Sequence, residues 1–359
     1  MSGTVTDALN YWSRSVPNLP AIDFDGDVVT YSELAGWADG VAHDLASRGV
    51  SPGDRVSFLG ANSLERAVAS LGAMKVGAIA VGFNHRMLAG ELTTLVEDCE
   101  PKVVYCDEAL LPRLEEVQQA RNTFSIAVFE KDVRTLRGGD HAKYRTPIVD
   151  LDTPAAIVFT SGTTGKPRGV IFTHATIAGE MHEWLLMEPI QQNGLRPVLV
   201  LPLFTTAGIL WGISRVVLHG GTLFLQPKFE PSEALRILSE EKANTLTGPP
   251  ILFEQIAKAP GFVDADLSHM VTAHVGGARV PVGLLHKWQA RGVALQRCDK
   301  YTGRPKSADR RPQCPATKHP NIPTSAGGAE SSPKSEWSTL KETTYRHTKP
   351  VRSCFADRA

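Results

Sequence analysis

Along residues 20–295, segments with an apolar residue every three or four positions alternate with short continuous apolar runs. Spacings of three or four residues predict amphipathic helices, and short continuous apolar runs predict buried strands. The predicted helices are residues 31–49, 63–75, 89–98, 174–186, 231–242, 250–258 and 281–291. The predicted strands are residues 55–59, 78–83, 101–107, 155–160, 196–203, 220–226, 243–248 and 269–276. This alternation predicts an α/β fold of layered, mainly parallel sheets flanked by helices, with a change of subdomain near Gly138–Gly139.

The most apolar stretch, residues 198–214, is too short and too interrupted to predict a transmembrane helix. It contains Pro202, Thr205, Thr206 and Gly208, and Arg215 follows it, so we expect a buried strand, loop and helix. The N-terminus lacks a basic region followed by an apolar one, so no secretory signal is predicted.

Charge is balanced overall, with 38 Lys and Arg against 38 Asp and Glu. This balance gives no electrostatic argument for nucleic acid as a partner. The balance hides two unlike parts, because residues 297–359 carry a net charge of +7 and the first 296 residues carry −7. The basic segment has seven prolines and few apolar residues, which predicts a disordered tail.

Cysteine and histidine usage points to a reduced compartment and to no metal site. Three of the five cysteines lie in the basic tail, which leaves Cys99 and Cys106 for the remainder. No CxxC or histidine spacing suggests metal ligands. We therefore expect a cytoplasmic location, with peripheral membrane binding left open.

The strongest chemical signal is a run of small and hydroxylated residues after the predicted strand 155–160. Residues 159–170 read FTSGTTGKPRGV. Glycines let several backbone N–H groups turn toward one point, hydroxyl groups add donors, and Lys166 and Arg168 add positive charge, which suits a polyphosphate. Only two residues separate Gly162 from Gly165, so this is not the Walker pattern, which needs four. The alternative interpretation is an ordinary polar turn.

Further segments in the same order make the chain resemble the adenylate-forming superfamily over residues 10–296. That superfamily contains acyl-CoA synthetases, peptide-synthetase adenylation domains and luciferases. The segments are TYSEL (30–34), PGDRV (52–56), AMKVGAIAVGFN (73–84), the phosphate loop, LPLFTTAGI (201–209) and VGGARVP (275–281). The first and fifth resemble acid–CoA ligases most closely.

The resemblance implies a reaction and a set of site residues. A carboxylic acid, expected to be a fatty acid, would react with ATP and Mg²⁺ to form an acyl-adenylate, from which the thiol of coenzyme A displaces AMP. Thr163, Lys166 and Arg168 are the implied catalytic residues; the family's usual lysine is Arg168 here, which keeps the charge but changes the shape. The implied phosphate cradle is Thr160, Ser161, Gly162, Thr163, Thr164, Gly165 and Lys166.

Two more segments carry implied binding residues. Gly276, Gly277 and Ala278 match the family's adenine-binding strand end, although a tight strand-to-helix turn would explain them as well. The loop lining the acyl pocket is matched by Phe204, Thr205, Thr206 and Gly208. Many relatives have histidine where Thr205 stands, and the alternative is an ordinary buried loop.

The basic tail lacks the family's remaining motifs. After Gln296 the family has Tyr-Gly-x-Thr-Glu, whose Glu supports Mg²⁺, then a ribose-binding Asp and a small domain with a catalytic Lys. The chain instead reads QRCDKYTGRPKSADRRP from residue 296. Codons shifted by one position from Asp299 onward can encode Gln-Val-Tyr-Gly-x-Thr-Glu, which predicts a frameshift between Gly292 and Arg297.

On this hypothesis residues 1–296 are an incomplete AMP-binding domain, residues 297–359 are out of frame, and the small C-terminal domain is absent. A genuinely divergent basic tail is the alternative. The functional prediction is an acid–CoA ligase with impaired activity; the alternative is an inactive remnant that binds nucleotide or acts as an interaction protein.

Overall fold

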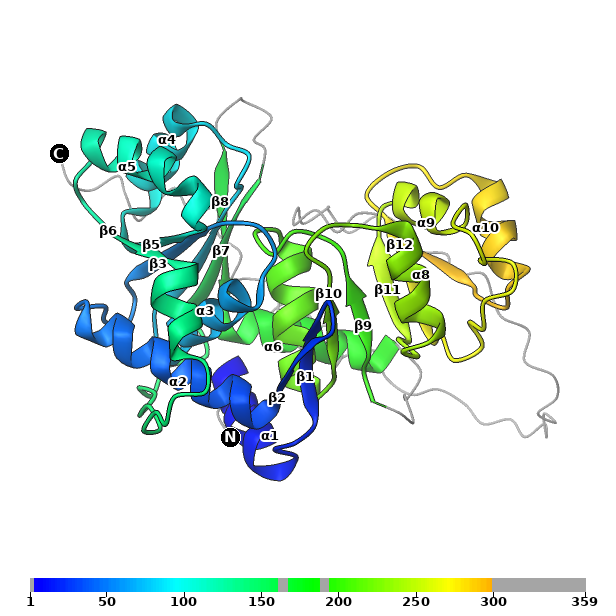
Figure 1. Ribbon diagram of the computed structural model, residues 1–359, viewed down its shortest axis with the longest axis horizontal. Helices are drawn as coiled ribbons and strands as arrows, with labels where there is room; N and C mark the ends of the chain where they lie inside the picture. The colour runs from blue at the N-terminus through cyan, green and yellow to red at the C-terminus, as the bar shows by residue number, and fades with distance from the viewer. Residues whose placement is uncertain (1–2, 161–166, 188–193, 299–359) are drawn as a thin grey trace, which may run out of the picture. The chain divides into compact units, whose positions relative to one another are not determined.

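Two sheets organise the chain in the computed structural model, which describes residues 3–160, 167–187 and 194–298 (Figure 1). The larger has the order β13-β12-β11-β9-β10-β1-β2, and the smaller has the order β6-β5-β3-β4-β7-β8. The strands of the larger sheet are β1 (Pro20–Phe24), β2 (Asp27–Thr30), β9 (Pro197–Leu199), β10 (Leu223–Leu225), β11 (Thr245–Gly248), β12 (Thr272–Gly276) and β13 (Leu295–Cys298). Those of the smaller sheet are β3 (Arg55–Leu59), β4 (Ile79–Phe83), β5 (Pro101–Cys106), β6 (Ser125–Val128), β7 (Pro154–Thr160) and β8 (Arg168–Thr173).

Most neighbouring strands run parallel, as the long βα connections require. The antiparallel pairs among the described strands are β1–β2 and β7–β8, each joined by a short hairpin or loop. The sequence prediction of mainly parallel sheets flanked by helices is therefore confirmed.

Helices fill the connections between the strands. The α-helices are α1 (Val5–Ser15), α2 (Tyr31–Ser47), α3 (Leu64–Lys75), α4 (Ala89–Cys99), α5 (Leu111–Ala120), α6 (His174–Met187), α7 (Arg215–His219), α8 (Pro231–Ser239), α9 (Pro250–Ile256) and α10 (Val282–Gln289). The other helical segments are η1 (Glu108–Leu110), η2 (Phe129–Val133), η3 (Arg134–Leu136) and η4 (Ala207–Ser214), of which η2 and η4 are π-helical. Helix α2 begins with a capping box: the Glu33 N–H donates to the Thr30 hydroxyl and the Thr30 N–H donates to the Glu33 carboxylate.

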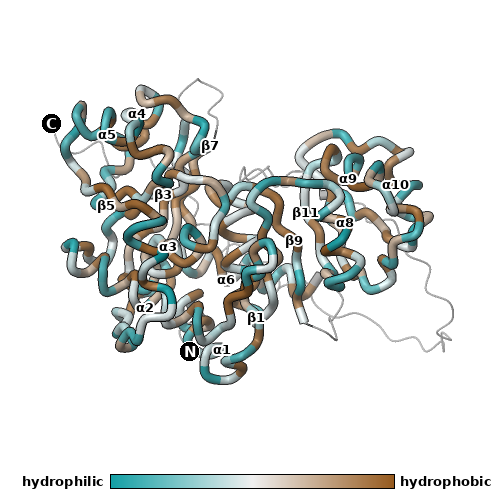
Figure 2. Tube along the Cα trace, viewed as in Figure 1, coloured by the Kyte–Doolittle hydropathy of each residue, from teal (hydrophilic) through white to brown (hydrophobic). Residues whose placement is uncertain are grey.

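The apolar residues separate into layers, as the brown segments of the hydropathy tube indicate (Figure 2). One face of the smaller sheet packs on α4 and α5. One face of the larger sheet packs on the α8–α10 region. The remaining faces of both sheets share a central cluster with α1, α2, α3, η4 and α7. These shared helices hold the two sheets against each other, because their buried side chains belong to both packing faces.

Several predicted boundaries differ from the structure. The strand expected over residues 196–203 ends at Leu199, because the chain then leaves the sheet and its backbone binds Asn62 instead. The predicted change of subdomain at Gly138–Gly139 is wrong, since β6 and β7, on either side of that turn, belong to one sheet. No element was predicted from the sequence at α1, β1, β2, α5, β6, β8 or β13, where the hydrophobic pattern is weaker.

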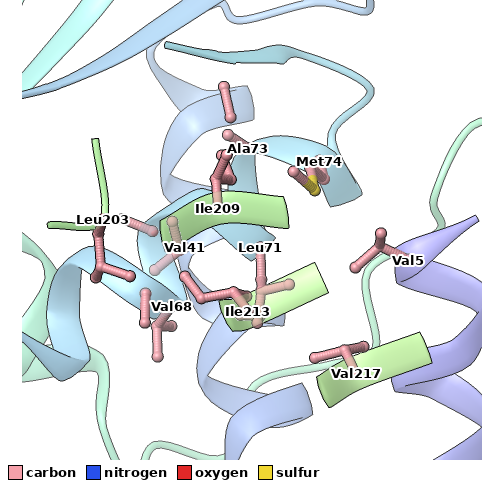
Figure 3. Close-up of a cluster of buried hydrophobic side chains, with 14 of the residues drawn as sticks. Val5, Val41, Val68, Leu71, Ala73, Met74, Leu203, Ile209, Ile213 and Val217 are labelled. Atoms are coloured by element: carbon pink, nitrogen blue, oxygen red, sulfur yellow. The ribbon is translucent and has the colours of Figure 1, made fainter. Parts of the chain in front are cut away.

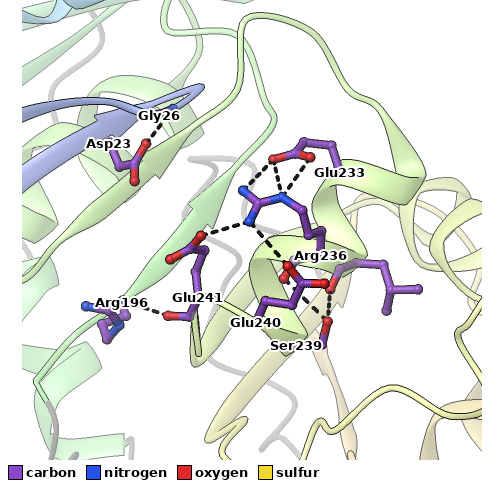
Figure 4. A network of polar contacts seen from close by, with 9 residues as sticks. Asp23, Gly26, Arg196, Glu233, Arg236, Ser239, Glu240 and Glu241 are labelled. Atoms are coloured by element: carbon purple, nitrogen blue, oxygen red, sulfur yellow. Dashed lines mark hydrogen bonds and ion pairs between the residues drawn. The ribbon is translucent and has the colours of Figure 1, made fainter.

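A network of hydrogen bonds and ion pairs lies on the surface at the C-terminal end of α8 (Figure 4). The Arg236 guanidinium contacts Glu233 and Glu241 at 2.8 Å each, and hydrogen bonding to Glu233 is the main reason that the pKa of Arg236 is raised. The Arg196 side chain donates to the Glu241 carbonyl at 2.6 Å. Exposed ion pairs each contribute little to the free energy of unfolding. The main effect of this network is therefore to position the segments that lead into β9 and β11.

Candidate functional site

The carboxyl ends of β9, β11 and β12 meet at one edge of the larger sheet, because these strands are parallel neighbours. Ligands of open α/β sheets bind at such an edge. Beyond β9 lies the segment Leu201–Gly208, and the segments Gly248–Pro249 and Gly276–Ala278 begin at the last residues of β11 and β12. The structure thus places the predicted acyl loop and the predicted adenine segment on the same edge.

The predicted phosphate loop belongs to the other sheet and joins β7 to β8. Thr160 ends β7, and its hydroxyl donates to the Arg168 carbonyl at 3.3 Å, which closes the neck of the loop. The Arg168 side chain is exposed. The other predicted cradle residues lie outside the described residues, so their roles stay predictions: Ser161, Gly162, Thr163, Thr164, Gly165 and Lys166.

Strand β4 brings the phosphate-loop strand and the acyl loop together. Gly82 of β4 pairs with Val158 of β7, and a Cβ atom on Gly82 would lie 2.7 Å from the Phe204 Cα atom. The His85 ring also meets the Phe204 ring edge to face, with centroids 5.9 Å apart. A side chain at Gly82 would therefore push the acyl loop away from the smaller sheet.

Asn62 joins the two sheets at the same edge. It follows β3 and is 8% exposed. Its amide nitrogen donates to the carbonyls of Leu201 and Gln226 at 3.1 Å each, and its amide oxygen accepts from the Leu203 N–H at 2.8 Å. One buried side chain thus fixes the backbone on the N-terminal side of Phe204.

Positive charge lies behind this junction. Arg66 is 1% exposed and donates to the Gly60 carbonyl; burial lowers its pKa to about 10, so it is charged at neutral pH. The pKa of His85 is lowered by burial and by the nearby Arg66 and Arg86, so its ring is neutral at pH 7. At the same turn, burial raises the pKa of Asp107, whose carboxylate accepts the Ala61 N–H at 2.8 Å.

The acyl loop is held by its own hydrogen bonds. The Thr205 hydroxyl donates to the Pro202 carbonyl at 2.7 Å and accepts the Gly208 N–H at 3.2 Å. A Cβ atom on Gly208 would lie 2.4 Å from the Leu203 Cα atom and the Pro202 oxygen, so this position requires glycine. Phe204, Thr205 and Thr206 are half-buried. Both hydrogen bonds of the Thr205 hydroxyl thus lie within the loop and hold its turn.

The predicted adenine segment is open. Gly276 is half-buried, and Gly277 and Ala278 are exposed. Gly277 has φ of 79°, and no atom lies within 4 Å of the position that its Cβ would occupy. A left-handed glycine beside open space gives a flat backbone surface that a planar ring can approach.

The residues that join these segments were not predicted from the sequence. Gly82 and His85 lie inside the AMKVGAIAVGFN match and the turn after it, and Asn62 directly follows a buried strand. A polar residue at the carboxyl end of a parallel strand is the signal that could have identified Asn62.

The fold agrees with a match to a family of known proteins. The family model for the AMP-binding enzyme matches residues 9–298, and the chain belongs to this family. The acid–CoA ligase relatives support the predicted branch.

The chain is 29% identical over 283 residues to feruloyl-CoA synthase from Amycolatopsis sp. (79% of this chain, 56% of the relative). It is 28% identical over 291 residues to indoleacetate–CoA ligase from Aromatoleum aromaticum (78% and 56%). The inhibitor-bound N-terminal domain of FACL13 from Mycobacterium tuberculosis superimposes with a TM-score of 0.74 at 25% identity (83% and 75%). The chain spans about half the length of the curated relatives it matches.

Proposed function

We propose that this chain is an ATP-dependent acid–CoA ligase of impaired activity, whose reaction takes an apolar carboxylic acid, expected to be a fatty acid. A carboxylate oxygen attacks the α-phosphorus of ATP, the bond from that phosphorus to the bridging oxygen breaks, and pyrophosphate leaves. The sulfur of coenzyme A, having lost its proton, then attacks the acyl carbon, and AMP leaves with the electrons of the broken acyl–oxygen bond. The first step joins two anions, so it depends on fixed positive charge and oriented donors.

The observation that supports this proposal is the junction made by Gly82, Asn62 and Phe204. It holds the loop predicted for the acid beside the strand that leads into the loop predicted for the phosphates. Positive charge comes from Arg168, at the neck of the phosphate loop, and from the buried Arg66 in helix α3. The open surface at Gly277 and Ala278 receives the adenine in this proposal.

Mg²⁺ enters this proposal with the nucleotide. Across the described ranges, no group of three or more His, Cys, Asp or Glu side chains could hold a metal ion. Mg²⁺ is commonly held by substrate phosphates and one or two carboxylates, so the phosphates of ATP are the proposed main ligands. When bound, the ion would neutralise charge on the departing pyrophosphate.

The test separates nucleotide binding from turnover. Acid-dependent exchange of labelled pyrophosphate into ATP is measured with a panel of fatty and aromatic acids, and ATP affinity is measured by calorimetry. We expect Thr163→Ala with Thr164→Ala to weaken ATP binding, whereas the exposed Thr135→Ala leaves it unchanged. ATP binding without exchange would indicate a nucleotide-binding remnant, and failure to bind ATP would refute the assignment.

A second proposal concerns residues 297–359. We infer that these residues come from a shifted reading frame, and the end of the family match at residue 298 supports a junction between Gly292 and Arg297. The nucleotide sequence from codon 290 onward tests this directly. A single-base correction that restores Tyr-Gly-x-Thr-Glu would support the inference, and an uninterrupted divergent tail in independently sequenced DNA would refute it.

Among the described helices, none combines the length and apolar character needed to cross a membrane.

A further inference from the structure

A very small cavity lies directly behind the acyl loop. Leu201 and Ala207 line it from the loop, Thr247 lines it from β11, and Trp211 and Arg215 line it from the helical segment that follows the loop. Its volume is about 10 Å³, which is space for about one water molecule. An acyl chain that passed Phe204 and continued along β9 and β11 would meet this wall.

Helix η4 cannot shift away from the cavity, because the opposite face of this helix packs in the hydrophobic core. Ile209 and Ile213 of η4 pack among buried side chains of α2 and α3 that include Val41, Val68 and Leu71 (Figure 3). On the sheet side, a Cβ atom on Gly212 would lie 2.4 Å from the Leu199 Cδ2 atom. Helix η4 is therefore clamped between α3 and β9, and its side chains define the space behind the loop.

The Trp211 indole is fixed in its position. Its ring nitrogen donates to the Glu180 carboxylate at 2.6 Å, and its ring lies 6.0 Å from the Trp184 ring, measured between centroids. The Arg215 guanidinium lies 4.7 Å above the centre of the Trp184 ring. A charge-assisted hydrogen bond and ring packing together oppose rotation of Trp211 away from the cavity.

We propose that Trp211 is the floor of the acyl pocket and limits the substrate to compact acids, such as a short-chain fatty acid or an acid with a single ring. This inference rests on the proposed ligase function and assigns the length limit to one side chain. Long-chain acids are excluded because the chain beyond the first few carbons has no space between η4 and β9.

The experiment measures how binding affinity depends on the length of the acyl chain, and it does not require turnover. Non-hydrolysable acyl-sulfamoyl adenosines with butanoyl, octanoyl and dodecanoyl groups, and the acyl-free parent compound, are titrated into the full chain by calorimetry. We expect the native chain to bind the butanoyl compound most tightly. In Trp211→Ala, the ratio of dodecanoyl to butanoyl affinity should rise at least about tenfold, since each buried CH₂ group contributes about a factor of four. Trp211→Phe serves as the conservative control and should shift this ratio much less.

The outcomes separate the two proposals. Equal or tighter binding of the dodecanoyl compound by the native chain, or an unchanged ratio in folded Trp211→Ala, would overturn the role of Trp211. If the native chain binds none of the adenosine compounds, the ligase proposal itself fails. If Trp211→Ala does not fold, Trp211→Leu, which keeps an apolar side chain, must show the same direction of change or the inference is rejected.

Discussion

The two ends of helix α3 bury polar side chains in different ways. At the C-terminal end, the Lys75 ammonium group is fully buried and donates to Asp39 at 2.5 Å, to the Ala35 carbonyl at 3.3 Å and to Asn10 at 3.2 Å. Just before the N-terminal end, Asn62 binds three backbone groups of loops that surround the candidate site. Lys75 thus joins α1, α2 and α3, whereas Asn62 joins the two sheets.

This difference separates a structural role from a positioning role. The partners of Lys75 lie on helices, and the candidate binding segments lie on other parts of the chain. The partners of Asn62 flank the acyl loop. A change at Lys75 should therefore reduce the free energy of unfolding alone, and a change at Asn62 should also alter acid binding.

The largest expected effect comes from Lys75→Met, which leaves the Asp39 carboxylate buried without its cation. Breaking a buried pair in this way costs about 3–5 kcal/mol of folding free energy. Urea unfolding measures the loss. Lys75→Met combined with Asp39→Leu should recover most of it; a double variant as unstable as the single one would mean that the charge pair is not the cause.

Asn62→Ala is expected to destabilise the fold less than Lys75→Met does and to act on binding as well. It leaves two carbonyls and one N–H without their partner, at a cost of about 1–3 kcal/mol. Calorimetry should show weaker binding of butanoyl-sulfamoyl adenosine relative to ATP. Asn10→Ala, which removes a partner of Lys75 at the other end of α3, is the matched control. An equal change in that affinity ratio for both variants would remove the distinction between the two ends.

Acid should destabilise a third buried region, around α7 and β12. Burial, together with the nearby Arg215, lowers the pKa of His219 and of His274 to about 4. The unfolded chain binds these protons near pH 6.5, so stability falls as the pH drops from about 6.5 toward 4, by about 2 kcal/mol per histidine at pH 5. Urea unfolding at pH 7 and pH 5 measures the slope. His219→Gln should flatten it, and an unchanged slope would contradict the assignment.

The smallest expected effect is that of Gly277→Ala, at the open end of the site edge. A non-glycine residue at φ of 79° costs about 1 kcal/mol. Gly283→Ala in α10, where the added methyl also meets no atom within 4 Å, is the control and should be neutral or stabilising. Thermal unfolding and ATP titration compare the two variants. Identical ATP affinity in both would argue against adenine at this segment.

Many of the helices and strands could be predicted from the sequence, because the hydrophobic pattern that identifies each one lies within its own residues. Periodicity located α2, α3, α4 and most of the parallel strands. The phosphate loop inferred from the Thr- and Gly-rich run after β7 stays a prediction, because most of that run lies outside the described residues. The fold class and family membership are confirmed by the sheets and by the family match.

The residues that assemble the site could not be predicted in this way, because their contacts join distant parts of the chain. Asn62 and Leu201 are 139 positions apart, so the local sequence around either one does not show that they are in contact. Gly82 is required only because Phe204 packs against it. The strand predicted over residues 196–203 is too long, because its apolar run does not show where the strand ends. The residues after Leu199 leave the sheet and form hydrogen bonds with Asn62, which is distant in the sequence.

The π-helical winding of η4 has a consequence for how this pocket can diversify. A π-helix contains a wider turn than an α-helix, with hydrogen bonds five residues apart. Such a turn absorbs one extra residue, so removing a residue and returning to ordinary winding would leave the later side chains, Trp211 among them, close to their present directions. A deletion here would also fall on Gly208, whose N–H is bound by the Thr205 hydroxyl. The shape of the pocket therefore changes more readily by substitution at position 211 than by a change in the length of η4.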